Sequence, residues 1–244
     1  MQFVSVIMPY YRKKKYVKDA IHSVINQSYK DIELIIVYDD KETQDFEFLK
    51  NITLKYSNVR IIRNSENVGA GQSRNNGIIN AKGNLIAFID ADDFWYREKI
   101  DKQVSFLIEK NLDFVFCDYL RKKQEKTRKI ICKKNVLTYK DLLYSCDVGL
   151  LTVLIKKNII QNNLFPKLKT KEDFVTWLKI AKQGIYPTKV NETLAVWNDV
   201  DGSLSSNVFQ KILDGYRVYR QFQNLSFIKS LYYLFFLSIN SLNK

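Results

Sequence analysis

The segment Asn84-Leu85-Ile86-Ala87-Phe88-Ile89-Asp90-Ala91-Asp92-Asp93-Phe94-Trp95 joins an apolar run to a group of carboxylates. The apolar residues 85–89 predict a buried strand that ends at Asp90. Asp90 and Asp92 follow with one residue between them, where the chain leaves the core. Two carboxylates so placed can share a hard cation, because Mg²⁺ and Mn²⁺ prefer oxygen ligands and often bind carboxylates together with substrate phosphates. Strand ends and helix caps are also often acidic, so a purely structural role stays open.

The residues before this segment alternate between strand and helix patterns. Strands are predicted at residues 4–8 (ended by Pro9), 32–37 and 59–62, and helices at residues 17–25, 46–56 and 72–81. Near-continuous apolar strands that alternate with helices are typical of an α/β fold with a mostly parallel central sheet flanked by helices. In such sheets, ligands bind at the carboxyl ends of the strands. Polar residues gather at those ends, namely Tyr10, Tyr11, Asp39, Asp40, Asp90, Asp92 and Asp93.

Three further motifs, at Asp39, at residues 67–74 and at residues 172–173, each have both a chemical and a structural interpretation. Asp39 can accept a hydrogen bond from a base or a ribose, or it can form a simple Asx-turn. The glycine-containing turn at residues 67–71 leaves amides free near an anion, and Arg74 in the next helix can face a phosphate or the solvent. Glu172 and Asp173 begin a predicted helix, so a carboxylate there is either a general base or a favourable partner of the helix dipole.

The second half of the chain is less regular. Strands are predicted at residues 114–117 and 149–155, a basic hairpin or exposed loop at 121–134, a helix at 173–183 closed by Gly184, and a helical tail at 208–244. This tail is basic and rich in Tyr, Phe and Leu, which favours contact with an anionic membrane surface, packing on the catalytic domain, or a homodimer.

Composition narrows the functional class. A formal net charge of +13 indicates an anionic partner, although a basic surface can also serve solubility alone. The three cysteines have no C-x-x-C spacing, which predicts neither a disulfide framework nor a zinc site. His22 is the sole histidine, which excludes most His-based chemistry. It is expected on the polar face of its helix. We find no signal peptide or membrane-spanning pattern, so we expect a cytoplasmic protein, peripheral on the inner face of the cytoplasmic membrane if the tail binds there.

Several motifs together resemble the family-2 glycosyltransferases, which have the GT-A fold. Val4-Ser5-Val6-Ile7-Met8-Pro9-Tyr10-Tyr11 resembles the opening strand of that family, and Phe88-Ile89-Asp90-Ala91-Asp92-Asp93 is similar to its F-[IL]-D-x-D-D. Glu172-Asp173-Phe174-Val175-Thr176-Trp177-Leu178 is similar to its E-D-[YF]-x-x-W-L signature. Weaker similarities lie at residues 25–29, 35–40, 69–77 and 203–205. The motifs follow in family order over roughly residues 3–206, so the ordered set is more specific than any one of them.

The resemblance implies an inverting transferase that moves a sugar from a nucleotide diphosphate donor, most often UDP, to a glycan or lipid-linked acceptor. The setting would be synthesis of a bacterial surface polysaccharide such as capsule or lipopolysaccharide. It implies a catalytic domain at residues 1–206, with a nucleotide-binding half at 1–95 and an acceptor-binding half at 96–206, and a basic aromatic helical tail at 207–244. Asp173 would be the catalytic base, supported by Glu172, and Asp92 and Asp90 would bind Mn²⁺ or Mg²⁺. The donor-binding residues would be Pro9, Tyr10, Tyr11, Asp39, Arg74, Asp90, Ala91 and Asp92.

This chain departs from the family pattern at three points. Tyr38 replaces the first Asp of the usual pair, and Tyr11 replaces a common Asn. Trp197-Asn198 stands where many members carry Tyr-Arg, so an arginine near the diphosphate is either missing or supplied from elsewhere.

Three other functions are consistent with parts of the sequence. A nucleotidyltransferase would want a glycine-rich loop after the first strand, and residues 10–15 contain no glycine. A hydrolase would release free sugar without an acceptor. A nucleic-acid-binding protein would explain the charge, but no recognisable binding signature accompanies it, so we expect no nucleic-acid partner.

Overall fold

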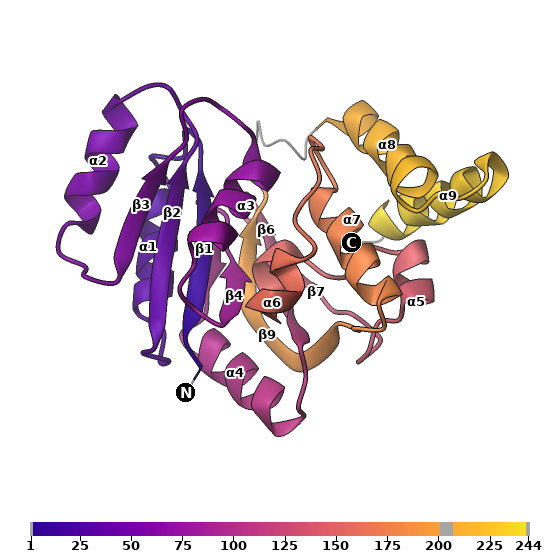
Figure 1. Cartoon of the computed structure of the whole chain (residues 1–244), viewed down its shortest axis with the longest axis horizontal. Coiled ribbons are helices and arrows are strands. Elements are labelled where there is room, and N and C mark those ends of the chain that lie inside the picture. Colours follow the sequence, from indigo (N-terminus) through magenta and orange to yellow (C-terminus); the bar gives the residue numbers. More distant parts are fainter. Residues whose placement is uncertain (1, 201–206, 243–244) are drawn as a thin grey trace.

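The computed structural model describes residues 2–200 and 207–242, in which the strands form one sheet. Its strand order is β3-β2-β1-β4-β8-β6-β9-β5, with β7 paired to β6. The first four strands are parallel, as predicted: β1 (Val4–Tyr10), β2 (Ile32–Tyr38), β3 (Val59–Arg63) and β4 (Leu85–Phe88). The sequence-predicted α/β class is therefore confirmed, and the carboxyl ends of these strands meet at one edge (Figure 1).

The second half of the sheet is mixed. Strand β8 (Leu154–Lys156) runs antiparallel to β4 and to β6 (Phe114–Lys123). Strand β9 (Thr188–Asn198) is parallel to β6 and antiparallel to the short β5 (Phe94–Trp95). Strand β7 (Lys126–Ile130) forms a hairpin with β6, which confirms a hairpin in the basic stretch.

The prediction that Pro9 ends the first strand was wrong, because β1 continues to Tyr10. The Ile7 carbonyl accepts from the Ile89 amide on the β4 side, and Pro9 points to that same side two residues later. The β1–β4 pairing ends at Ile7, whereas β2 continues alongside β1 to Tyr10. Proline has no N–H to donate, and here no neighbouring strand requires one.

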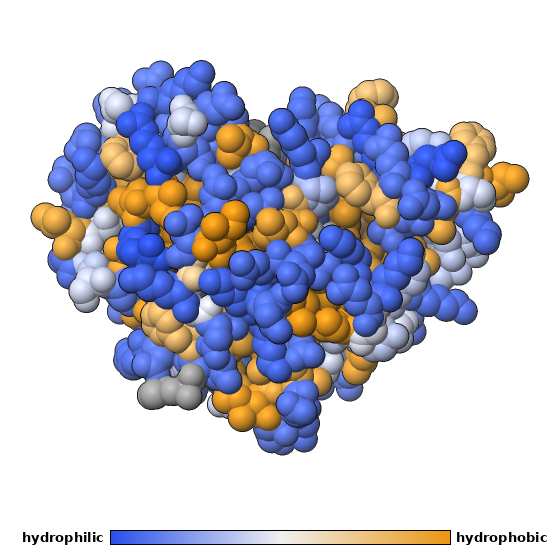
Figure 2. Space-filling view, in the orientation of Figure 1, coloured by the Kyte–Doolittle hydropathy of each residue, from blue (hydrophilic) through white to orange (hydrophobic). Residues whose placement is uncertain are grey.

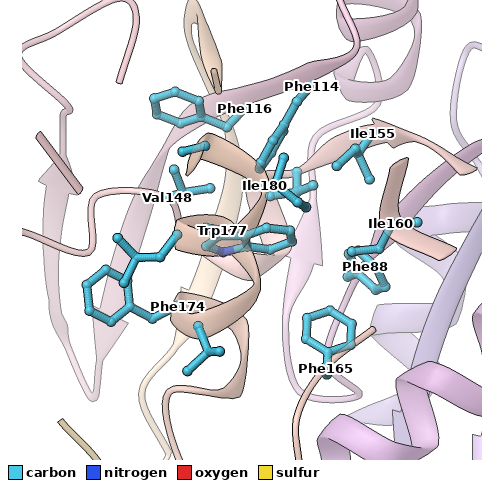
Figure 3. Packing of buried hydrophobic residues seen from close by; sticks show 14 of the residues in the cluster. Phe88, Phe114, Phe116, Val148, Ile155, Ile160, Phe165, Phe174, Trp177 and Ile180 are labelled. Carbon is cyan, nitrogen blue, oxygen red and sulfur yellow. The ribbon is translucent and has the colours of Figure 1, made fainter. Parts of the chain in front are cut away.

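Helices cover both faces of the sheet, as predicted. Helices α1 (Val17–Ile25), α2 (Gln44–Thr53) and α4 (Lys99–Glu109) contribute to one buried cluster. The opposite cluster draws on α3 (Ala70–Asn80), α5 (Tyr139–Tyr144), α6 (Lys157–Gln161) and α7 (Glu172–Lys182). In that second cluster Trp177 of α7 packs between Phe88 and Phe114, with Phe165 beside them (Figure 3). The buried apolar side of α7 thereby holds its first turn against the carboxyl edge of the sheet.

The predicted helical tail forms α8 (Val208–Arg217), a π-helical turn η3 (Val218–Phe222) and α9 (Phe227–Leu242). Tyr219 and Leu237 belong to the same core cluster as the buried residues of α7, so one side of this tail packs on the α/β fold. The S-L-S similarity at residues 203–205, and the predicted domain boundary at 206, lie outside the described residues. Within the described residues, none of the helices has the length and apolar character that a membrane span requires.

Sequence reasoning missed or misplaced several elements. It gave no element at α4, α5, α6 or β9, and it predicted one strand at residues 149–155. That stretch is instead a 3-10 turn, η1 (Leu150–Thr152), followed by β8. Strand β9 is the most consequential omission. Its end brings Asn198 to the loop at residues 90–93 after β4, the acidic loop, where Asn198 contacts Asp92 and Asp93.

Candidate functional site

The β1 and β2 strand ends hold two of the predicted donor residues in buried positions. Tyr10 is fully buried, its ring stacks on Tyr38 at 5.5 Å, and its hydroxyl donates to Asp45 at 2.7 Å. Burial and Asp45 raise the pKa of Tyr10. Tyr11, one residue later, is exposed, and Pro9 is partly exposed. Of the two predicted tyrosines, only Tyr11 therefore presents its ring to a ligand in this conformation.

Asp39 is buried and organises the turn that leads into α3. Its carboxylate accepts hydrogen bonds from the amides of Val68 and Gly69, each at 2.9 Å, and from the Asn64 side chain at 2.8 Å. A carboxylate offers about four acceptor positions, so these three donors leave one for a ligand. The neighbouring Asp40 pairs with Arg12 at 2.7 Å, and this guanidinium lowers the pKa of Asp40.

Arg74 joins two motifs that are far apart in sequence. Its side chain is almost fully buried, which excludes the solvent-facing interpretation. One terminal nitrogen donates to Asp90 at 2.6 Å and the other to Glu172 at 2.7 Å. Its Nε is buried and finds no hydrogen-bond partner among the described residues. A planar guanidinium fork is suited to such a two-sided contact, and it places the start of α7 next to the acidic loop after β4.

The acidic loop concentrates negative charge. Asp93 is buried and accepts from the Asn198 amide at 3.0 Å, and burial together with Asp90 and Asp92 raises its pKa well above the usual value. Burial and Asp90 also raise the pKa of Asp92. Asp92 pairs with the Lys13 ammonium at 2.6 Å. Carboxylates whose pKa values are raised by burial and by neighbouring carboxylates mark a place where an added cation is favourable.

Glu172 and Asp173 occupy the first turn of α7. Burial raises the pKa of Glu172 to about 7, and the nearby Asp173 adds to the rise. Asp173 is partly exposed, and its carboxylate accepts from the Phe174 amide at 2.7 Å. Burial raises the pKa of Asp173 as well, against the opposing effect of Arg74. Asp173 therefore combines access to solvent with a raised affinity for a proton, which suits a general base.

The residues present fit a metal bound in part by a substrate. Among the described residues no group of three or more His, Cys, Asp or Glu side chains could hold a metal alone. Asp90 and Asp92 supply the one or two carboxylates that Mg²⁺ or Mn²⁺ uses when phosphates complete its shell. The Lys13 ammonium on Asp92 shows that this carboxylate already accommodates a cation.

Sequence reasoning missed Lys13 and Asn198 as site residues. Lys13 belongs to the basic run at residues 12–15, in which the sequence alone does not distinguish one cation from another. Asn198 was noted as a departure from Tyr-Arg, and its side chain donates to the Asp92 carbonyl at 2.5 Å. A groove of about 400 Å³ beside them is lined by Asp92, Asn198 and Lys122 among others. A hollow of about 480 Å³ lined by residues of α1 and the region of α2, including Lys18 and Leu54, contains none of these carboxylates.

Comparisons with known proteins show which family and fold the chain resembles. The model of the family described as "Glycosyl transferase family 2" matches residues 5–169. The chain is 34% identical over 229 residues to TuaG of Bacillus subtilis, provisionally named a teichuronic acid biosynthesis glycosyltransferase, covering 93% of this chain and 91% of that one. It is 31% identical over 213 residues to WfaP of Escherichia coli, covering 87% and 84% of the two chains. WfaP is named a UDP-Glc:alpha-D-GlcNAc-diphosphoundecaprenol beta-1,3-glucosyltransferase.

Two solved structures show the same fold. Staphylococcus aureus TarS 1–349 in complex with UDP-GlcNAc superposes with a TM-score of 0.76 at 20% identity, covering 95% of this chain and 70% of that one. The mannosyltransferase PcManGT of Pyrobaculum calidifontis, with GDP-Man and Mn²⁺, gives a TM-score of 0.72 at 15% identity, covering 92% and 65%.

Proposed function

The chain belongs to glycosyl transferase family 2, and we propose that it is an inverting enzyme that moves a sugar from a UDP-sugar to a hydroxyl of a glycan or lipid-linked acceptor. The observation that carries the proposal is the Arg74 bridge between Asp90 and Glu172. It brings the acidic strand end and the first turn of α7 to one place. The names of WfaP and TuaG favour a lipid-linked acceptor and surface polysaccharide synthesis.

Asp173 is the proposed general base. The acceptor oxygen attacks the anomeric carbon, its proton passes to Asp173, and the bond from that carbon to the diphosphate oxygen breaks with its electron pair leaving on the nucleoside diphosphate. Because burial raises the proton affinity of Asp173, it is a stronger base than a surface carboxylate. Arg74 and Glu172 fix the start of α7, which positions Asp173 for this transfer.

Asp90 and Asp92 would hold Mn²⁺ or Mg²⁺, which when bound offsets the negative charge of the leaving diphosphate. Lys13 contacts Asp92 here and lies on the loop after β1, at the same edge as Tyr11. With a metal held by Asp92, the Lys13 ammonium would be free to contact the donor phosphates. Lys13 would then supply part of the positive charge that an arginine at the position of Asn198 provides in many family members.

Pro9, Tyr11 and Asp39 would bind the nucleoside, with Ala91 in the loop beneath it. The exposed ring of Tyr11 offers a stacking surface, and the remaining acceptor position of Asp39 suits a base N–H. Tyr10 would not contact the nucleoside directly. Its buried ring and its hydrogen bond to Asp45 would instead fix the end of β1.

Nucleotide binding tests the donor and metal assignments. We expect UDP with Mn²⁺ to raise the melting temperature more than GDP, dTDP or CDP, because a ligand that binds only the folded state stabilises it. Asp92→Asn should lose the Mn²⁺-dependent part of the shift. Asp113→Asn, which removes a partly exposed carboxylate paired with Lys156, should keep it.

The base assignment is tested by transfer from the donor identified in that screen. Asp173→Asn should keep the nucleotide shift but lose transfer by roughly 10²–10⁴-fold, since only proton removal is affected. The absence of a shift with any nucleotide would contradict the donor site. Full transfer by Asp173→Asn would contradict the base alone.

A further inference from the structure

Helix α9 is apolar on two opposite sides. One side is buried: Ser230 and Leu237 lie in the core, and Tyr233 stacks on Tyr219 at 5.7 Å. The other side is open to solvent, with Ile228 78% and Phe235 61% exposed. At 3.6 residues per turn, the exposed residues form a single stripe along the helix, made of Ile228, Leu231, Tyr232, Phe235 and Ile239.

Helix α8 extends this apolar surface. Phe209 and Ile212 are exposed on α8, and Tyr216 contacts Phe227 edge to face at 6.4 Å, which ties α8 to the start of α9. Figure 1 places α8 and α9 together at the end of the molecule opposite α2, and Figure 2 shows apolar side chains at that end. We call these residues of α8 and α9 the α8–α9 apolar face. Contiguous exposed apolar surface on a soluble domain marks an interaction site.

The positive charge near this face favours an anionic partner over a second copy of the chain. Residues 215–242 contain no Asp or Glu but include Arg217, Arg220 and Lys229. The acidic residue just before them, Asp214, is buried and bound by Thr170, Gln210 and Arg217. A second copy of this face would bring like charges together. An anionic lipid surface attracts the cations and accepts the apolar and aromatic side chains in its interfacial layer.

We propose that the α8–α9 apolar face lies in the headgroup layer of an anionic membrane. The contact is interfacial, and α9 stays packed on the catalytic domain by its buried side. Gly215 of α8 lies against the Lys171 side chain, where an added Cβ would be 3.7 Å from Cε. Lys171 directly precedes Glu172 and Asp173, so the membrane contact would hold the start of α7 close to the lipid. The proposal stands without the proposed function, because vesicle binding requires no donor.

Vesicle flotation of the full chain tests the proposal. We expect binding to vesicles of phosphatidylcholine mixed with phosphatidylglycerol, weaker binding to phosphatidylcholine alone, and a decrease as salt is added. Ile228→Asp with Phe235→Asp should weaken binding to anionic vesicles by roughly tenfold or more, since it places two carboxylates in the apolar layer. The matched control is Leu54→Asp with Ile108→Asp, which adds the same charge at exposed apolar sites on other elements and should retain binding.

Three results would overturn the proposal: no binding to anionic vesicles, equal binding by the two double variants, or a lipid-free dimer that Ile228→Asp with Phe235→Asp dissociates. The last result would show that a second copy covers the face. A retained nucleotide-dependent thermal shift would show that the variant is folded, and it keeps failure of the membrane contact separate from failure of the donor site.

Discussion

Glu172 is a buried carboxyl that shares one guanidinium with Asp90 and adjoins Asp173. Burial raises the pKa of Glu172 from 4.5 to about 7. Between these values the folded protein keeps a proton that the unfolded chain has released. Stability therefore falls as the pH rises through this interval, and the loss is complete above the folded pKa.

This pH dependence can be measured by urea denaturation of wild type and Glu172→Gln. Between about pH 5 and pH 7, the free energy of unfolding of wild type should fall relative to that of Glu172→Gln, because glutamine does not titrate. Glutamine keeps an oxygen that accepts from Arg74. Parallel curves, or a relative gain by wild type, would show that the Glu172 pKa is not raised.

Helix α3 packs against β1 through a glycine. A Cβ at Gly77 would lie 2.4 Å from Cγ2 of Ile7, a fully buried residue of the central strand. The helix therefore approaches the sheet closely enough for Arg74, one turn earlier, to reach the acidic loop. Glycine at this position serves close packing, since its backbone is helical.

Substitution of Gly77 by alanine should reveal this contact. Gly77→Ala gains helix propensity but forces α3 away from β1, and we expect a net loss of about 1–3 kcal/mol in the free energy of unfolding. Ile79→Ala, on the exposed side of the same helix, should stay within about 0.5 kcal/mol of wild type. Stabilisation by Gly77→Ala in urea denaturation would contradict the close approach.

The two halves of the molecule are joined at the site by a buried ion pair. Arg74 comes from the parallel half and Glu172 from α7, 98 residues later in the chain. Removing one partner of a buried pair leaves the other charge without compensation. The bridge therefore couples the integrity of the acidic loop to the docking of α7.

We predict that at pH 8, where Glu172 is ionised, Arg74→Met lowers the free energy of unfolding by about 3–5 kcal/mol. Arg74→Met combined with Glu172→Leu should recover part of that loss, because no buried charge is then left unpaired at Glu172. Lys156→Met removes a partly exposed pair with Asp113 and should cost at most about 1 kcal/mol. An Arg74→Met loss no greater than that of Lys156→Met would show that the bridge contributes little to joining the halves.

Local pattern was enough to determine the parallel half of the sheet. The strands at residues 4–8, 32–37, 59–62 and 85–89 carry their own apolar signal, and the helices between them have one buried side each. Parallel strands end at one edge of a sheet. The sequence therefore also predicted that Asp39 and Asp90 lie at the same edge. The exposure of His22 was also correctly predicted, since its place in a helical pattern fixes its side.

Only the tertiary structure decided which groups contact one another. Strand β9 has a weak pattern of its own and gains its place by pairing with β6, so the position of Asn198 could not be predicted. Lys13 lies in a run of four cations, and only the folded β1–α1 loop selects the one that reaches Asp92. Arg74 joins Asp90 to Glu172, and Tyr10 is buried, because long-range packing brings together side chains that local periodicity treats separately.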